Sequence, residues 1–171
     1  MSREDLESNL GTIARSGSLQ FKQELAQKDE GDKTDIIGQF GVGFYSAFMV
    51  ADKLTVISKA YGSDEAWQWE SSGVDGYEMT PAQKDTAGTQ IILHIKPDTE
   101  TDHYDNFLDE YGIVAIVKKY SDYVRYPIQM EREKSRQKPE PDPKPDDYKP
   151  EWETYTELET LNSMVAIWKK Q

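Results

Sequence analysis

Residues 36–50 run IIGQFGVGFYSAFMV, with glycines at positions 38, 41 and 43, and this stretch decides how the rest of the chain is interpreted. The glycines lead directly into an apolar run, which predicts a loop followed by a short helix over about residues 43–50. Glycine lets a ligand approach the backbone closely, and a helix N-terminus offers unpaired N–H groups with about half a positive charge. The pattern suggests a phosphate cradle. A glycine turn packed for tightness is the alternative, and spacing alone does not separate the two.

Two other segments favour the cradle. Residues 11–17, GTIARSG, form a second small-residue loop that carries one cation. Gly88 and Thr89 open a strand rich in β-branched residues, which we expect to be central and to place a hydroxyl group inside the domain. The histidines His94 and His103 lack metal-ligand spacing, and neither a Gly-x-Ser-x-Gly motif nor a full Walker pattern occurs. The sequence therefore nominates no catalytic residue and no metal ligand.

A dinucleotide-binding module is a weaker alternative. Gly41-x-Gly43-x-x-Ser46 approximates the dinucleotide fingerprint, and Asp64 follows about twenty residues later. However, the third glycine is replaced by serine, and the following strands are joined by tight turns instead of helical crossovers.

Charge and composition exclude other classes of function. The 171 residues contain 20 Lys and Arg against 32 Asp and Glu, so the net charge is −12. This acidity argues against nucleic-acid partners and against binding to an anionic membrane surface. The chain has no cysteine, which removes disulfides and thiolate chemistry and fits a reducing compartment. We find no signal peptide and no apolar run of the roughly 18 residues that a membrane helix needs, so we expect a cytoplasmic protein.

The remaining periodicities predict an α+β domain. Ser2 and Asp5 are placed as a capping box for a first helix that ends near Gly11. A second helix begins near Ser18, and a long one covers residues 105–123. Strands are predicted over residues 53–59, 66–71, 76–80 and 89–95, with a short edge strand over 126–130. Tight turns between consecutive strands imply antiparallel pairing, so we expect a mostly antiparallel sheet with helices on one face.

The C-terminal part has a different composition. Five of the eight prolines lie between positions 139 and 150, within a charged stretch that has almost no aliphatic residues. Such a stretch cannot bury enough apolar area to offset the cost of ordering its backbone. We therefore predict a domain over residues 1–130, a mobile charged proline-rich linker over 131–157, and the start of another domain over 158–171.

Four blocks of this sequence resemble the N-terminal ATPase domain of the heat-shock protein 90 chaperones, particularly the bacterial ones. They are DLxxNLGTIAxSG at 5–17, IGQFGVGFYS at 37–46, WESS at 69–72 and GTxIILH at 88–94. The resemblance implies the two-layer α/β sandwich shared with gyrase B, histidine kinases and the mismatch-repair protein MutL, incomplete here at its N-terminus. It also implies ATP and Mg²⁺ as cofactors, client proteins as partners, a homodimer of the intact protein, and slow ATP hydrolysis coupled to the chaperone cycle.

The same resemblance implies roles for individual positions. Met1 would line the adenine pocket, Thr89 would join its water network, and Trp69 would be at most a pocket-side aromatic. The other implied nucleotide contacts belong to the first helix, the lid and the glycine segment: Asn9, Leu10, Arg15, Ser16, Gly17, Gln39, Gly41, Val42, Gly43 and Phe44.

Some elements of the family's site have no counterpart in this sequence. The Glu that activates water, the Asn that holds Mg²⁺ and the Asp that reads adenine lie, in the family, upstream of the position matching Met1. Because phosphoryl transfer depends on positioning and charge stabilisation, we expect this chain alone to hydrolyse ATP negligibly. A non-enzymatic fragment that binds polypeptide through apolar surface is the second hypothesis.

Overall fold

The computed structural model describes residues 1–12, 38, 41–139 and 149–165. It confirms the α+β class and divides into two compact units, Met1–Tyr104 and Asp105–Gln171. The first unit contains α1 (Arg3–Leu10), η1 (Gly43–Met49), β1 (Ala51–Lys59), β2 (Ala66–Ser71), β3 (Glu78–Ala82) and β4 (Gly88–Ile95). After η2 (Tyr104–Phe107), the second unit contains α3 (Glu110–Tyr120), β5 (Gln129–Gln137) and β6 (Trp152–Thr160). The predicted helix near Ser18 lies outside the described residues.

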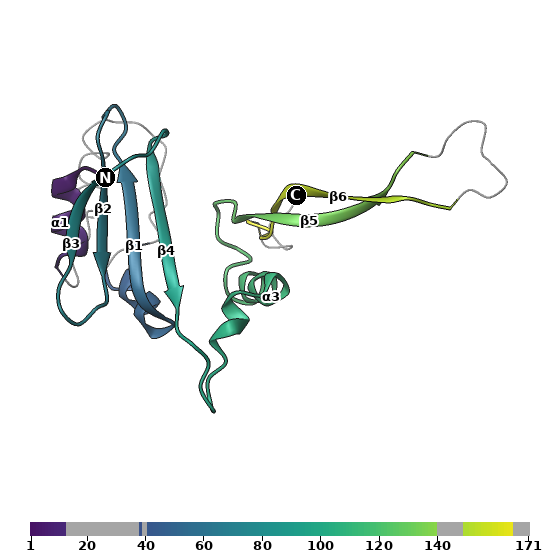
Figure 1. The fold of residues 1–171 in the computed structure, drawn as a ribbon, viewed down its shortest axis with the longest axis horizontal. Coiled ribbons are helices and arrows are strands. Elements are labelled where there is room, and N and C mark those ends of the chain that lie inside the picture. The colour runs from purple at the N-terminus through teal and green to yellow at the C-terminus, as the bar shows by residue number, and fades with distance from the viewer. Residues whose placement is uncertain (13–37, 39–40, 140–148, 166–171) are drawn as a thin grey trace. The chain divides into compact units, whose positions relative to one another are not determined.

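The first unit is built on a four-stranded sheet in the order β3-β2-β1-β4 (Figure 1). Each neighbouring pair is antiparallel. The short connections predicted this pairing for β1 with β2 and for β2 with β3. The expectation that residues 89–95 form a central strand is wrong. β4 pairs with β1 instead of with β3, and no described strand pairs with its outer side, so it lies at the edge of the sheet that the described residues form.

The register of the sheet decides which side chains enter the core. Leu54 and Val56 of β1 lie opposite Ser71 and Trp69 of β2, so these four residues share one face. Leu54 and Val56 are fully buried and Trp69 nearly so. They form one apolar cluster with Leu6 of α1. Burial of this face against α1 and η1 is therefore what holds the helices on the sheet.

The first helix begins as its sequence predicts. Ser2 accepts a hydrogen bond from the Asp5 amide at 3.1 Å, and the Asp5 carboxylate accepts one from the Ser2 amide at 2.8 Å. This reciprocal capping box satisfies two donors that the first turn cannot pair internally. The helix ends at Gly11, whose amide donates to the Glu7 carbonyl.

The helix predicted after the glycine segment is present as the 3₁₀ helix η1. Glycine, serine and aromatic residues are modest α-helix formers, and short segments of this kind commonly adopt 3₁₀ geometry. Lys96 caps the C-terminal end of η1. Its ammonium group donates to the Phe48 carbonyl at 2.9 Å and to the Met49 carbonyl at 3.2 Å. A cation there also complements the negative end of the helix.

The long helix predicted over residues 105–123 is shorter than expected. Asp109 interrupts it: its carboxylate caps α3 by accepting from the Gly112 amide at 2.6 Å, and its own backbone is extended. Aspartate at an N-cap favours such a break. The preceding turn forms η2 instead.

The expectation of a mobile linker over residues 131–157 is wrong for 131–137 and 152–157, which belong to the antiparallel hairpin of β5 and β6. Composition suggested disorder because the segment lacks aliphatic residues. What composition cannot show is that the register sets the cations on the β5 side and the carboxylates on the β6 side on the same face of the hairpin, directly or diagonally across from one another. Four cations pair in this way: Arg132 with Glu159, Lys134 with Glu157 and Glu159, Arg136 with Glu153, and Lys138 with Glu151. The placement of the domain boundaries stays a prediction.

Arg132 also ties the hairpin to the helix of the same unit. Its guanidinium group donates to Glu110 of α3 as well as to Glu159, the latter at 3.1 Å. The hydrogen bond to Glu110 is the largest cause of the raised pKa of Arg132. One side chain thus connects the first turn of α3 to both strands.

Replacing Leu54 by alanine should strongly destabilise the first unit. Its side chain is fully buried in the central strand, and Leu→Ala changes in cores cost about 2–5 kcal/mol in the free energy of unfolding. Urea unfolding followed by tryptophan fluorescence measures the change. Leu108→Ala is the matched control, because Leu108 is 70% exposed and its loss should change stability by less than about 0.5 kcal/mol. Equal effects of the two substitutions would contradict the assigned core.

The hairpin should lose order in acid. The hydrogen bond from Lys134 is the main cause that holds the pKa of Glu159 below its ordinary value. Because the pKa is lower in the folded chain than in the unfolded one, the stabilisation is present above about pH 4.3 and is lost as the pH falls through the lowered value. NMR Cα shifts of residues 129–137, followed from neutral pH into the acid range, report the loss. In Glu159→Gln the acid transition should be smaller. An identical transition in both proteins would show that the ion pairs of Glu159 are not its origin.

Candidate functional site

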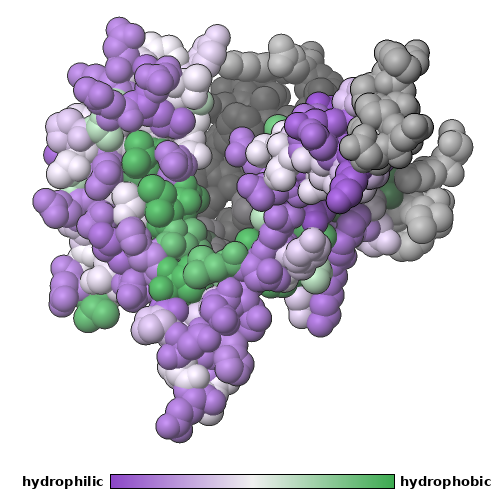
Figure 2. All heavy atoms as spheres, turned by 45° about the vertical axis from the view of Figure 1, so that its right-hand side comes forward, coloured by the Kyte–Doolittle hydropathy of each residue, from purple (hydrophilic) through white to green (hydrophobic). Residues whose placement is uncertain are grey.

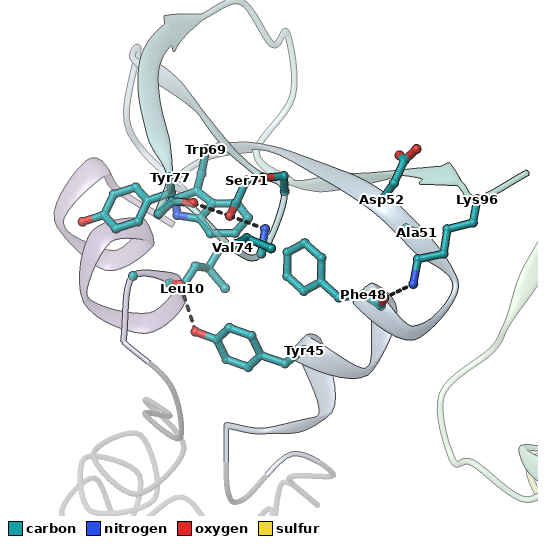
Figure 3. Close-up of a pocket in the computed structure, with 14 residues that line it drawn as sticks. Leu10, Tyr45, Phe48, Ala51, Asp52, Trp69, Ser71, Val74, Tyr77 and Lys96 are labelled. Atoms are coloured by element: carbon teal, nitrogen blue, oxygen red, sulfur yellow. Dashed lines mark hydrogen bonds between the residues drawn. The ribbon is translucent and has the colours of Figure 1, made fainter.

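The first unit contains a cavity of about 730 Å³ between the C-terminal end of α1, the helix η1 and the start of β1 (Figure 3). Its wall is mainly apolar, with hydroxyl groups and two charged side chains at a few places. The lining residues come from segments far apart in the sequence: Leu10, Gly11, Tyr45, Phe48, Ala51, Asp52, Trp69, Ser71, Ser72, Gly73, Val74, Gly76, Tyr77 and Lys96. A mostly apolar concave site with a few polar groups is the usual form of a small-molecule pocket.

Trp69 is the central residue of this wall. Its ring stacks on Tyr77 with centroids 5.9 Å apart, and Phe44 meets it edge-on at 5.7 Å. The side chain is 2% exposed, and its indole Nε1–H has no hydrogen-bond acceptor among the described residues. An unpaired buried donor costs about 1–3 kcal/mol.

The two helices that flank the cavity are connected by a single hydrogen bond among the described residues. The Tyr45 hydroxyl group of η1 donates to the Leu10 carbonyl at the end of α1, at 2.9 Å (Figure 3). Burial raises the pKa of Tyr45, so the hydroxyl group stays protonated and remains a donor at neutral pH. It satisfies one of the carbonyls that a helix end leaves without a partner.

The turn between β2 and β3 holds Tyr77 in position. Ser71 Oγ accepts from the Gly73 amide at 3.0 Å and donates to the Gly76 carbonyl. Gly73 and Gly76 have φ of 85° and 93°, values that residues with a side chain rarely adopt. The serine and the two glycines together fold the turn back, so that Tyr77 reaches Trp69.

Glu70 is on the opposite face of the sheet and is held as a carboxylate. Thr55 Oγ1 donates to it at 2.9 Å and Lys53 Nζ at 3.3 Å. These hydrogen bonds, that from Thr55 first, lower the pKa of Glu70. Glu70 therefore faces away from the core side of the sheet, although it follows Trp69 directly in the sequence.

The structure brings some of the predicted site residues together. The N-terminal amine of Met1 donates to Ser58 Oγ at 2.7 Å, and Ser58 Oγ lies 2.9 Å from Thr89 Oγ1. Met1 and Thr89 therefore meet through one serine that sequence reasoning missed. The expectation that Thr89 places its hydroxyl group inside the domain is wrong, because β4 is an edge strand and Thr89 is exposed.

The other predicted residues fall in different places. Leu10 lines the cavity, Phe44 packs on Trp69, and Asn9 is half-buried on α1. The glycine segment enters η1 without lining the cavity; its described predicted members are Gly41, Val42 and Gly43. Arg15, Ser16, Gly17 and Gln39 lie outside the described residues.

The predicted place of Trp69 on a cavity wall is confirmed, whereas most of the other wall residues were not foreseen. Tyr77, Phe48 and Lys96 reach the wall from a turn, a helix end and the residue after β4. A signal existed only for Tyr77, since the glycines before it indicate a tight turn next to Trp69. Lys96 depends on the pairing of β4 with β1, which no local pattern reveals.

Comparison with known proteins identifies relatives. The chain is 57% identical over 170 residues to the chaperone protein HtpG of Clostridium botulinum, a match that covers 99% of this chain and 26% of that protein. The HtpG chaperones of Natranaerobius thermophilus and Clostridium perfringens are each 54% identical over the same proportions. No family model matches the chain. The predicted resemblance is confirmed, and the chain spans about a quarter of the length of these relatives.

Among the described residues, no helix combines the length and apolarity needed to cross a membrane.

Substituting Gly11 by alanine should disturb the cavity wall. A Cβ atom there would lie 2.8 Å from Tyr77 Cε1 and would also strike the Glu7 carbonyl. Overpacking of this kind costs about 1–3 kcal/mol and should displace Tyr77 from Trp69, which near-ultraviolet circular dichroism detects. The control is Gly43→Ala, where a Cβ meets nothing within 4 Å. If Gly11→Ala keeps the native spectrum and stability, the close packing at this wall is wrong.

Proposed function

We propose that this chain, which belongs by sequence to the heat-shock protein 90 family of chaperones, is part of a molecular chaperone that binds ATP to drive the folding of client proteins. The observation that carries the proposal is the match to chaperone HtpG over 99% of the chain. Because the chain spans 26% of that protein, the chaperone activity is the proposed role of the whole protein. Within it, residues 1–130 would supply the C-terminal part of the nucleotide-binding domain.

The start of η1 is the proposed phosphate contact. Gly41 has a φ of 65°, and Gly43 has open space where a side chain would be. The Tyr45 amide already pairs with the Val42 carbonyl, whereas the amides of Gly43 and Phe44 precede the first hydrogen bond that the helix can make. These two amides are therefore suited to an anionic oxygen. Mg²⁺ would accompany the nucleotide, and no residue of this chain is nominated to hold it.

The Met1–Ser58–Thr89 group is the proposed base-side contact. Its members lie within hydrogen-bond distance of one another through Ser58. Hydroxyl groups at the exposed start of β4 can bind ordered water, and bridging waters transmit base recognition nearly as well as direct hydrogen bonds. Phosphate contacts made by backbone amides suit a chain with a net charge of −12, because the amides can bind the anion without nearby cationic side chains.

Polypeptide binding without nucleotide is the second candidate. It is favoured by large apolar side chains that the described residues leave exposed, including Val74, Leu108 and Tyr111. A dinucleotide-binding module is less favoured, because all strand pairs among the described residues are antiparallel, whereas that fold needs a parallel sheet. Cytoplasmic location, client proteins and homodimerisation of the longer protein belong to the proposal.

Titration with Mg-ATP, followed by tryptophan fluorescence, separates the candidates. Phe44 lies at the proposed phosphate contact and against Trp69, so nucleotide binding should change the indole emission saturably at micromolar concentrations. No response to ATP, together with suppression of aggregation of a denatured test protein, would favour polypeptide binding alone. A response to NAD in preference to ATP would favour the dinucleotide module.

Gly43→Leu should abolish the nucleotide response while far-ultraviolet circular dichroism stays unchanged. A Cβ atom at this position meets nothing within 4 Å, so the new side chain blocks the approach of a phosphate without disturbing the fold. Tyr61→Leu is the control, since Tyr61 is 97% exposed in a turn, and it should titrate as the unmodified chain does. An unchanged titration of Gly43→Leu would refute the proposed cradle.

A further inference from the structure

The second unit buries few side chains, and those it buries lie directly after the hairpin. Neither β5 nor β6 has a buried residue, and hydrophilic residues cover most of the face shown in Figure 2. Among the described residues of this unit, the two buried ones are Leu161, which is 3% exposed, and Asn162, which is 5% exposed. The segment that follows β6 is therefore the best-buried part of the unit.

The side chain of Asn162 connects this segment to the residues between α3 and β5. Its Oδ1 accepts a hydrogen bond from the Ile128 amide at 2.8 Å. Its Nδ2 group donates to the Val124 carbonyl at 2.8 Å and to the Tyr126 carbonyl at 2.9 Å. An amide side chain offers one carbonyl oxygen and two N–H donors, so one orientation of the amide satisfies all three contacts. The side chain thus pairs with the backbone as a neighbouring strand would.

Backbone hydrogen bonds extend this connection on both sides of the asparagine. The Leu161 amide donates to the Ile128 carbonyl at 2.8 Å. The Ser163 amide donates to the Asp122 carboxylate at 3.0 Å, and the Met164 amide donates to the Asp122 carbonyl at 2.8 Å. Four consecutive residues after β6 are therefore held by the segment that precedes β5.

We call the contact between residues 122–128 and 161–164 the clasp. The clasp is tied to α3, because Lys118 Nζ donates to the Asp122 carboxylate at 3.2 Å. Met164 has a φ of 58°, a value that residues with a side chain seldom adopt. Such a backbone conformation persists where the surrounding contacts over-determine it. The clasp therefore fixes the path of the chain as far as Met164.

The proline-rich segment is closed off by the hairpin on its other side. The Lys138 amide donates to the Glu151 carbonyl at 2.8 Å, and the Lys138 ammonium group donates to the Glu151 carboxylate at 2.9 Å. Residues 139–150 thus connect the ends of two paired strands. Since the register fixes β6 on β5, the length of this connection does not change where β6 ends.

We propose that the clasp, and not the proline-rich segment, sets the point at which any following chain leaves this unit. Residues 161–164 then move as one body with α3, and Asn162 is the positioning residue of that exit. A displacement of residues 122–128 is passed on to whatever follows residue 165. This places the end of the unit later than the boundary at residue 157 that the sequence predicts.

The first test measures a distance within the full chain. The chain has no cysteine, so two introduced thiols carry the only spin labels. Tyr120→Cys at the end of α3 and Val165→Cys after the clasp use positions that are 72% and 44% exposed. Double electron–electron resonance should give one narrow distance distribution. A flexible Gly-Ser insert that doubles the length of segment 140–148 should leave this distribution unchanged. A distribution that broadens with the insert overturns the proposal.

The second test replaces the amide by a carboxylate of nearly equal size. In Asn162→Asp the new group still accepts from the Ile128 amide but donates to neither carbonyl, and its negative charge lies beside both carbonyl oxygens. The loss of two hydrogen bonds should raise hydrogen exchange of the Ile128, Ser163 and Met164 amides at least about tenfold. The distance distribution should broaden as well.

The matched control is Gln83→Glu, which makes the same chemical change at an exposed position of the first unit and should alter neither measurement. The amides of β5 and β6 should stay protected in Asn162→Asp. If their protection is lost along the whole hairpin, the asparagine supports the unit in general, and its assignment to the exit is overturned. Unchanged exchange and an unchanged distance distribution in Asn162→Asp would also overturn it.

Discussion

The fold of the first unit depends on the burial of a small apolar cluster on one face of its sheet. Leu6 of α1 packs in one cluster with Leu54, Val56 and Trp69, and this cluster is the apolar core among the described residues. The chain has no cysteine to reinforce it. In a core this small each side chain supplies a large share of a marginal stability. The cavity wall, the position of η1 and the end of α1 all depend on the same contact, because Trp69 belongs both to the core and to the wall.

Local chemistry could be predicted from the sequence, and long-range pairing could not. The Ser2 cap, the strand over residues 66–71 and the helix after the glycines follow from neighbouring residues alone. The position of β4 does not, since its β-branched composition fits a central strand as well as an edge. Its place is set by pairing with β1, more than thirty residues away. The Ser58 bridge and the cavity residue Lys96 depend on that pairing too, which is why they were missed.

The two units are stabilised by different physics. The first unit buries apolar area, and its ion pairs, such as Lys53–Glu70, lie on the outer face. The hairpin of the second unit has exposed strands and holds its register through cross-strand charges. Exposed pairs are individually weak, but a network in register adds specificity, because a slip by one residue moves every charge to the other face. Composition alone indicates disorder for such a segment, since it counts charges without their positions.

Phe44 connects the glycine segment to the cavity. It follows Gly43 directly and packs edge-on against Trp69, while the next residue, Tyr45, holds the end of α1. A change in the backbone at the start of η1 therefore moves an aromatic ring that the core already contacts. Because protein interiors are densely packed, such a displacement is transmitted instead of being absorbed. The contact between Phe44 and Trp69 is thus the link between the glycine loop and the cavity, although the two share no lining residue.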